Sequence, residues 1–344
     1  MYFGLSGNRQ RLDMTIYNEE AISKLDTLCL EKEAACSSLW EILLNDFRCE
    51  NGKIYSPHGL QYVERRVPKR ALFDLLSHYV LNNPFRMTGA RFRHYADYDR
   101  AARRLVRQLG CLYDLRMMRQ VLTLALIHDH VPLHAMREPM VVIGDYWGVM
   151  ASLILTSLPR SKVVVVNLTK VLLSDLSTIR RAFPYLNVCL VKEAGDYQTA
   201  LSDPSLRVIA IRADDADLLG ESPIGLAINL LSMQEMHPDA ITIYFDAFRR
   251  APNSQTVFYC CNRNEVGLGY RGFFDYPWHP DDTCLVDELC PWVKYSYCLY
   301  PPFYRLHGPA FHHRLAILRK PVSNRQPLPR QPGRRIKSPD DRLQ

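Results

Sequence analysis

Polar and ionisable side chains follow directly after one apolar run of this 344-residue chain. The segment LAINLLSMQEM (226–236) places Asn229 and Glu235 in a short apolar context. Burying such groups without partners is costly, so we expect them to form part of a site. Asn229 is a candidate cofactor contact, and Glu235 is a candidate general base. The alternative is a structural role at the start of a helix, where the helix dipole favours a carboxylate.

A second group of candidates lies between residues 260 and 314, where proline, tryptophan, tyrosine and histidine concentrate with little periodicity. Long irregular segments inside a compact domain are usually lids or binding loops. Aromatic rings beside carboxylates and imidazoles suit a carbohydrate, because rings stack on sugar faces while hydroxyls take hydrogen bonds. The alternative is a structural loop held by prolines and aromatic rings. The candidates are His313 and Asp287 for catalysis, and Arg263, Trp278, Glu288 and Trp292 for substrate binding.

His313 is the first candidate for a general base, and Glu235 is the second. An imidazole has an unperturbed pKa near 6.5, which suits a base at neutral pH. A base within hydrogen-bond reach of a hydroxyl accelerates its attack by roughly 10²–10⁴-fold. A structural role is the alternative for both residues.

A third group of candidates ends three other apolar runs. The first run continues into a turn that contains Gly144, Tyr146 and Gly148, where N–H groups at a helix start can face a cofactor. Many turns of this kind contain glycine only for their geometry. Asn167 ends the second run, at a position that often hydrogen-bonds a ribose. The third run precedes Asp214 and Asp215, which are candidates for contacting adenine. The alternative is that these aspartates belong only to a polar loop.

These groups need a scaffold, and the apolar pattern predicts one. Short β-branched runs alternate with helical stretches over residues 136–320, which indicates an α/β domain with a doubly wound parallel sheet. Residues 1–135 are predicted to be mainly helical, with apolar spacing typical of helices over Asn18–Leu44 and Asp99–His128. Residues 321–344 contain many prolines and basic residues, so we expect a disordered basic tail.

The ten cysteines give no metal-binding pattern. Cys260 and Cys261 are adjacent, so they should point to opposite faces of a strand, and the later cysteines are too widely spaced for a CxxC pair. We therefore expect reduced, partly buried thiols and no metal site.

Composition and charge narrow the function. The chain is 47% apolar and 23% charged, as in globular proteins. Its net charge of +7 comes from the flanks, because residues 136–320 carry 18 basic and 19 acidic side chains. We therefore expect no nucleic-acid partner. No apolar run reaches the roughly 20 residues of a membrane span, and the first residues lack the pattern of a signal peptide. We expect a cytoplasmic protein, and a homo-oligomer is left open.

Several sequence blocks together resemble the bacterial family of sugar O-methyltransferases over residues 136–320. The blocks are INLLSMQEM, YFDAFRR, VFYCCNR, the YPW at 276–278, DELCPW, HGP and HRLAIL. The resemblance implies a Rossmann-like methyltransferase fold preceded by a helical region, with S-adenosylmethionine as cofactor. It also implies methyl transfer to a sugar hydroxyl.

The cofactor side departs from that family more than the acceptor side does. Val142 stands where the family has an acidic residue, and Tyr146 replaces the middle glycine of the turn. The family's Asp-Leu-Pro-Glu after the second strand corresponds to residues 167–170, which read Asn-Leu-Thr-Lys.

The leading hypothesis is methyl transfer from S-adenosylmethionine to the hydroxyl of a sugar or nucleotide-linked sugar. A charged acceptor is favoured by the basic stretch between residues 64 and 119. The alternative is a catalytically inactive methyltransferase-like protein that binds a glycan or a protein partner. A nicotinamide-dependent sugar dehydrogenase is a third hypothesis, but the glycine turn is incomplete and the acidic ribose partner is missing.

Overall fold

The computed structural model describes most of the chain. The described residues are 29, 33–45, 47–50, 53–55, 71–145, 147–253, 255–267, 270–299 and 301–320. Tyr146 and the predicted tail at 321–344 lie outside them, as does most of the helix predicted to begin at Asn18.

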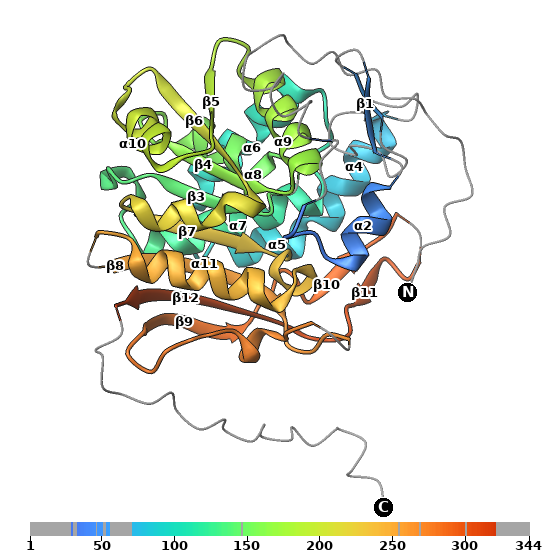
Figure 1. Cartoon of the computed structure of the whole chain (residues 1–344). Coiled ribbons are helices and arrows are strands. Elements are labelled where there is room, and N and C mark those ends of the chain that lie inside the picture. Colours follow the sequence, from blue (N-terminus) through green and yellow to red (C-terminus); the bar gives the residue numbers. More distant parts are fainter. Residues whose placement is uncertain are drawn as a thin grey trace, which may run out of the picture.

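A mixed sheet forms the centre of the described structure (Figure 1). Its strands lie in the order β5-β6-β4-β3-β7-β8-β12-β9. The first six are parallel, whereas β12 is antiparallel to β8 and β9 is antiparallel to β12. This confirms the predicted doubly wound α/β fold and adds an antiparallel edge. The strands are β3 (Met140–Ile143), β4 (Val163–Asn167), β5 (Asn187–Val191), β6 (Leu206–Arg212), β7 (Leu226–Leu230), β8 (Gln255–Arg263), β9 (Thr283–Leu289) and β12 (Phe311–Arg319).

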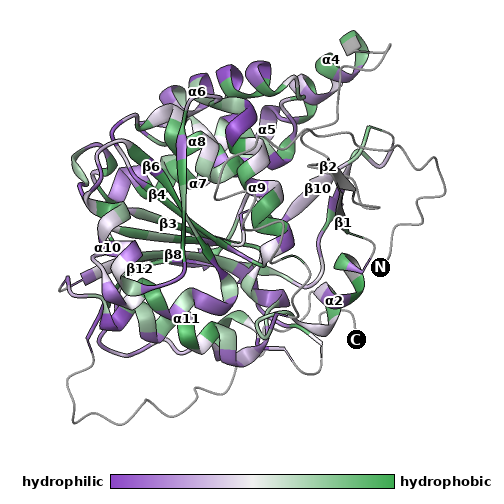
Figure 2. Ribbon diagram, turned by 45° about the horizontal axis from the view of Figure 1, so that its top comes forward, coloured by the Kyte–Doolittle hydropathy of each residue, from purple (hydrophilic) through white to green (hydrophobic). Residues whose placement is uncertain are grey.

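Helices cover both faces of this sheet, and the alternation of side chains along each strand explains why. In β3, Met140 and Val142 belong to the core on one face, whereas Val141 and Ile143 belong to the core on the other. Figure 2 shows the resulting apolar strands between helices with polar outer faces. The first face is covered by α6 (Tyr95–Leu109), α7 (Leu115–His130), α8 (Val149–Ser157) and α9 (Thr169–Ala182). The second is covered by α10 (Ala194–Ser202), the 3₁₀ segment η2 (Ala213–Glu221) and α11 (Pro238–Arg250).

The helices before residue 135 share their core with the sheet. Helix α7 is buried on almost every side, which explains its long apolar run at Val121–Ile127. The division of the chain at residue 135 stays a prediction. The shorter elements of this region are α2 (Ser38–Leu44), β1 (Arg48–Glu50), β2 (Lys53–Tyr55), α4 (Ala71–Leu81), α5 (Asn83–Gly89) and the 3₁₀ turn η1 (Leu133–Ala135).

Two predicted helices differ from the structure. The stretch Asp99–His128 is not one helix, because Gly110 has φ +64° and ends α6, and Asp114 then caps α7 by accepting from the N–H of Arg116 at 3.0 Å. The stretch Asn18–Leu44 is helical only from Ser38 onward within the described residues, and residues 33–35 instead bind Thr169 and Asp214.

The segment 260–314 is more regular than its composition indicates. Besides β9 it contains a hairpin of β10 (Tyr295–Tyr297) and β11 (Tyr304–Leu306), and the 3₁₀ turn η4 (Phe273–Asp275). Cys260 and Cys261 lie in the cores on opposite faces of the sheet, as predicted.

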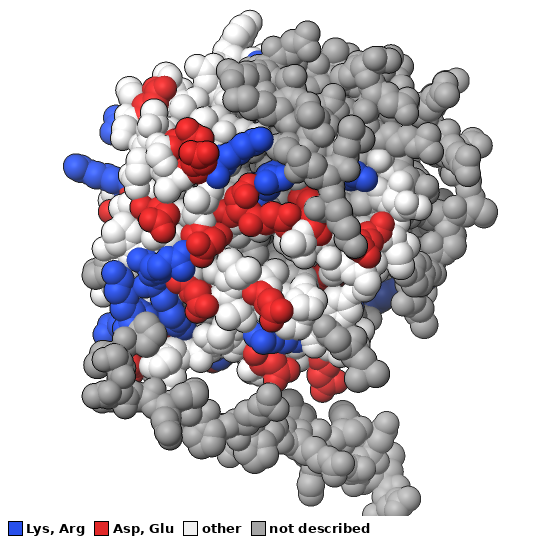
Figure 3. Space-filling model, viewed as in Figure 1, with Lys and Arg blue, Asp and Glu red and all other residues white. Residues whose placement is uncertain are grey.

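The surface charge concerns a nucleic-acid partner, and the length and polarity of the helices concern a membrane. On the face shown in Figure 3, acidic and basic side chains alternate in small groups, and no single basic surface covers its described part. Among the described residues, every helix is too short or too polar to cross a bilayer.

Candidate functional site

A cavity of about 540 Å³ opens at the carboxyl ends of β3, β4, β7 and β8. The chain passes from β3 to β4 on one side and later returns to β7 on the other side of β3, so the strand order reverses here. Ligands of open α/β sheets bind at such a reversal. The volume lies within the range of roughly 300–1,000 Å³ that is usual for ligand pockets.

The backbone around this cavity adopts unusual conformations. Trp147 and Leu231 have backbone φ values of 60° and 64°, which residues other than glycine rarely adopt. Both residues line the cavity. Gly144 has φ +61°, and a Cβ there would overlap the hydroxyl of Ser232. Strained backbone of this kind concentrates at functional sites. The turn after β3 is therefore fitted closely against the turn after β7.

Asp145 occupies the N-terminus of α8. Its two carboxylate oxygens accept hydrogen bonds from the N–H groups of Met150 at 2.9 Å and Ala151 at 2.8 Å. Asp145 is buried and also lines the cavity. The N–H groups that bind phosphate in many α/β proteins are thus already used by a carboxylate.

Asn167 is held at the end of β4 by a second buried carboxylate. Its amide donates to Asp175 Oδ2 at 2.8 Å and to the Asp145 carbonyl at 3.4 Å, while its oxygen accepts from Leu168 N at 3.0 Å. An aspartate at position 167 would place two carboxylates against each other. The departure from the family's acidic residue therefore has a local physical reason.

Asp175→Asn should stabilise the protein at pH 7 by more than about 1 kcal/mol, because burial and then Asp145 raise the pKa of Asp175 well above its usual value. Its folded pKa exceeds its unfolded pKa, so wild-type stability should fall as pH rises from about 4 through the folded pKa. The gain in the variant should grow over the same range. Urea unfolding between pH 4 and 8 measures it. Asp246→Asn, at an exposed position of α11, is the control, and an equal gain there would contradict the prediction.

Asn229 joins the ends of β3 and β7. Its amide donates to the carbonyl of Ile143 at 3.1 Å, and its oxygen accepts from Met233 N at 3.2 Å. The oxygen also accepts from the side chain of Asn262 at 2.8 Å. The predicted site residue Asn229 is thus fully buried and supports the turn after β7 instead of lining the cavity.

The same network fixes the 3₁₀ turn η3 (Met233–Glu235). Asn262 accepts from Gln234 N at 3.1 Å, and the Gln234 side chain accepts from Arg263 N at 2.9 Å. Glu235 follows directly and lines the cavity. The buried polar groups that the sequence indicated at 226–236 therefore have partners, and together they position one carboxylate.

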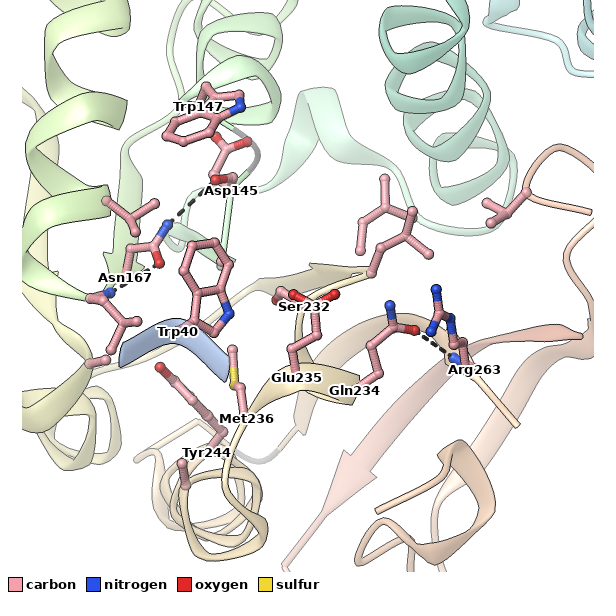
Figure 4. Close-up of a pocket in the computed structure, with 18 of the residues that line it drawn as sticks. Trp40, Asp145, Trp147, Asn167, Ser232, Gln234, Glu235, Met236, Tyr244 and Arg263 are labelled. Atoms are coloured by element: carbon pink, nitrogen blue, oxygen red, sulfur yellow. Dashed lines mark hydrogen bonds between the residues drawn. The ribbon is translucent and has the colours of Figure 1, made fainter. Parts of the chain in front are cut away.

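In the cavity lining Glu235 lies between Trp40 of α2 on one side and Arg263 on the other (Figure 4). Burial raises the pKa of Glu235, and the opposing effects of Arg263, Gln234 and Trp40 only partly offset it. A carboxylate of raised pKa is a stronger base than an exposed one.

The segment before α2 fastens Trp40 over the cavity. Glu33 accepts hydrogen bonds from the N–H and hydroxyl of Thr169, both at 2.7 Å, at the start of α9. Asp214 accepts from the N–H groups of Ala34 at 3.1 Å and Ala35 at 2.7 Å. Asp214, a predicted cofactor ligand, thus binds this segment.

Basic side chains line the side of the cavity next to β8. Arg116 and Arg119 come from the first turns of α7, and Arg263 ends β8. Arg119 is held in place by the carbonyls of Trp292 at 3.1 Å and Tyr295 at 2.8 Å. Two members of the basic stretch noted in the sequence therefore reach the site.

Among the predicted residues, Gly144, Asn167, Glu235 and Arg263 come together in the cavity lining, whereas His313 does not. The His313 side chain is fully buried, with Nδ1 3.1 Å from the Tyr259 hydroxyl and Nε2 3.5 Å from Glu288. Its ring contacts the buried Trp292 edge to face, with centroids 5.2 Å apart. His313, Glu288 and Trp292 thus form a group outside the lining.

Four other predicted residues also lie outside the lining. Asp287 accepts from His312 at 2.7 Å and from Arg314 at 2.8 Å. Trp278 packs in the core behind β8 and donates to the Phe273 carbonyl at 3.1 Å. The remaining two are Asp215, which pairs with Arg212 at 2.8 Å, and Gly148, which begins α8.

Several cavity residues were missed by the sequence reasoning. Asp145 lies within the glycine turn and had a local signal, because a carboxylate just before a helix is a common cap. Trp40 and Arg119 had none, because only the folded chain brings α2 and α7 to the sheet edge.

The chain matches no protein-family model and no curated protein. Among solved structures it is similar to the S-adenosylmethionine-dependent methyltransferase SibL in its apo form, with 13% identity over 87% of this chain and 96% of that chain, TM-score 0.31. An O-methyltransferase family protein from Burkholderia thailandensis shows 10% identity over 80% and 81%, TM-score 0.27. TrmN from Thermus thermophilus shows 14% identity over 58% of this chain, TM-score 0.30, and the chain spans about half of TrmN (48%). These similarities are too low to assign an activity or a substrate to this chain.

Proposed function

We propose that this protein transfers a methyl group from S-adenosylmethionine to the hydroxyl of a sugar that carries phosphate or a nucleotide. The observation that carries the proposal is the position of Asp145, a buried carboxylate that both caps α8 and lines the cavity.

Asp145 distinguishes between two classes of nucleotide ligand. Dinucleotide cofactors place their pyrophosphate on the N–H groups at this helix start, and a carboxylate there repels it. S-adenosylmethionine has no phosphate and carries positive charge on its sulfonium and amino groups, so the same carboxylate attracts it. This argues against the nicotinamide-dependent hypothesis.

The rest of this half of the cavity suits an adenosyl group. Trp40, Trp147 and Tyr244 provide aromatic surfaces, and Leu168 and Val171 provide an apolar wall. Such surfaces bind the flat face of a purine. Asn167 keeps an acceptor lone pair for a ribose hydroxyl after its other hydrogen bonds are made.

The opposite half suits an anionic acceptor. Arg116, Arg119 and Arg263 line it, and the Nε of Arg263 is buried without a hydrogen-bond partner among the described residues. Guanidinium groups bind phosphate oxygens in pairs. The sugar itself rests on the sequence resemblance, since the arginines favour only an anionic group.

The chemistry needs little beyond alignment and one base. S-adenosylmethionine supplies an electrophilic methyl group. Glu235 lies between the two halves and takes the proton of the acceptor hydroxyl as its oxygen attacks. Trp40 excludes water from the reacting atoms, and the arginines hold the acceptor in line.

The inactive alternative rested on Val142, Tyr146 and Asn167. Val142 is buried in β3 between Val165 and Ile228, where a carboxylate would have to enter the core. Asn167 is matched to Asp175. Tyr146 lies outside the described residues, so the alternative now depends on that position and on whether the cofactor binds.

Calorimetric titration with S-adenosylmethionine, S-adenosylhomocysteine and adenosine tests the proposal. Asp145→Asn keeps a capping oxygen but removes the negative charge. It should therefore weaken the binding of S-adenosylmethionine by about 10–100-fold, as expected for the loss of about 1.5–3 kcal/mol from a hydrogen bond to a charged group. Neutral adenosine should change little. The exposed Glu138→Gln is the control for net charge. Absence of binding by the wild type at millimolar ligand would overturn the proposal in favour of the inactive alternative.

A further inference from the structure

Three histidine side chains meet on the face of the sheet that α6 to α9 cover, outside the cavity lining. His94 caps the start of α6, His128 lies in the last turn of α7, and His134 lies in η1 just before β3. One ring nitrogen from each lies within 4.8 Å of the others. At 1.5 Å per residue, His128 is roughly 13 Å along α7 from Arg119, so this cluster is separate from the proposed methyl-transfer site.

The ring nitrogens of this cluster are available to a ligand. The Tyr98 hydroxyl binds His128 Nδ1 at 2.9 Å, which leaves Nε2 of that ring for the cluster. The rings of His94 and His134 make no hydrogen bond to any residue that the structure describes. His128 is buried, His94 is half-buried and His134 is exposed, so the cluster opens to solvent on one side.

The rings are also close enough to disfavour protonation. The centroids of His94 and His128 are 3.7 Å apart, and those of His128 and His134 are 4.5 Å apart. Burial, followed by His94 and His134, lowers the pKa of His128 to about 4, although Asp129 and Asp97 act in the opposite direction. The unprotonated imidazole is the form that binds metal ions.

We propose that His94, His128 and His134 bind a divalent transition-metal ion of the zinc class, with water at the remaining position. Imidazole is a preferred ligand for such ions, and a Zn–N bond of 2.0–2.1 Å requires tetrahedral ligand nitrogens roughly 3.3 Å apart. The ring of His94 stacks nearly parallel on that of His128, so it must rotate away from this stacked position to converge on the ion. The exposed ring of the cluster is that of His134, and Asp97 and Asp129 supply nearby negative charge.

The ion would join three segments that are distant in the sequence. It links the start of α6, the end of α7 and the turn that enters β3, the central strand of the cavity. The Tyr98 hydroxyl would orient the His128 ring, as groups bonded to metal-ligating histidines commonly do. The expected role is therefore structural, and methyl transfer does not depend on it directly.

Zinc titration of the full chain, stripped of metal with a chelator and kept reduced, tests this site. Wild type should bind one equivalent of Zn²⁺ that His134→Ala and His94→Ala do not bind. His130→Ala, two residues from His128 on the same helix, should bind like wild type. Tyr98→Phe should weaken binding by about 10–100-fold. Equal binding by wild type and both cluster variants, or no binding by wild type, would overturn the proposal.

Two further readouts separate this site from the cysteines and from a folding defect. Co²⁺ bound by three imidazoles should give visible d–d absorption without the near-ultraviolet bands of thiolate ligation. Zn²⁺ should raise the melting temperature of wild type and His130→Ala but not that of His134→Ala, whose metal-free melting temperature should stay near wild type because position 134 is exposed. Thiolate bands in Co²⁺-loaded wild type that persist in His134→Ala would assign the metal to cysteine and contradict the proposal.

Discussion

Replacing Glu235 by glutamine should lower kcat by about 10²–10⁴-fold, the usual contribution of a positioned general base. The carboxamide keeps the shape of the side chain but cannot take the proton of the acceptor hydroxyl. Because η3 is fixed by Gln234 and Asn262 and not by the Glu235 side chain, the affinity for S-adenosylmethionine should change little. Methyl transfer to a phosphorylated sugar and calorimetric binding of the cofactor measure the two effects separately.

The pH dependence gives the same prediction a second test. Burial raises the pKa of Glu235, so its ionised, basic form is lost at a higher pH than for an exposed glutamate. The wild-type kcat should therefore fall as pH is lowered through this raised pKa. The residual activity of Glu235→Gln should lack that fall, because glutamine does not titrate.

His313→Gln distinguishes the two candidate bases. The His313 side chain is fully buried and does not line the cavity, so this change should lower stability without a selective loss of kcat in the folded protein. A kcat of Glu235→Gln within about threefold of wild type, together with a large loss in His313→Gln, would move the role of base to His313.

Gly148→Ala should destabilise the protein by about 2–5 kcal/mol. The residue has φ +68°, a conformation that costs an L-residue roughly 1–2 kcal/mol, and crowding in a packed interior adds about 1–3 kcal/mol. The added Cβ would overlap the backbone oxygen of Asp175 and lie 3.0 Å from its Cα. Backbone atoms in the middle of α9 cannot move aside as a flexible side chain can.

Gly195→Ala is the matched control. Gly195 lies in α10, its φ is not positive, and an added Cβ there meets nothing within 4 Å. Alanine is favoured over glycine in a helix by roughly 0.5–1 kcal/mol, so this variant should be slightly more stable than wild type. Urea unfolding compares the two. Similar effects of both substitutions would show that α8 and α9 are not packed as closely as the structure has them.

The close packing around Gly148 explains the glycine without a cofactor contact. Gly148 is the residue directly before α8, and Asp145, three residues earlier, binds N–H groups at the start of the same helix. Unlike Asp145, Gly148 does not line the cavity. Its close approach to Asp175 explains why the turn needs glycine here. The role of Gly148 as a cofactor contact stays a prediction.

The sequence determined the α/β fold because the relevant signals are local. Buried parallel strands read as short β-branched runs, and four consecutive valines in β4 can form little else between two helices. Where the prediction of helices was wrong, a single residue decided the outcome. Gly110 ended a helix whose apolar spacing continued beyond it, because backbone conformation at one position interrupts a pattern that side chains continue.

The sequence also located part of the site, where polar groups sit at strand ends. Asn167 ends β4, Glu235 follows β7 and Arg263 ends β8, and these strands lie within the neighbouring set β4-β3-β7-β8, so the convergence of the three residues follows from the topology. His313 and Asp287 have equally suitable side chains but lie on the antiparallel edge of the sheet. There Asp287 binds His312, and His313 lies beside Glu288. Residue type alone did not distinguish the two sets.

Only the tertiary structure determined which side chains cover the cavity and which charged side chains line it. Asp214 binds Ala35 across 179 positions of the chain, and this contact holds Trp40 over the sheet edge. The meeting of His94, His128 and His134 depends in the same way on α6, α7 and η1 packing together on one face of the sheet. Local patterns specify strands and helices through short-range periodicity. Sites between them depend on long-range packing, which no local spacing records.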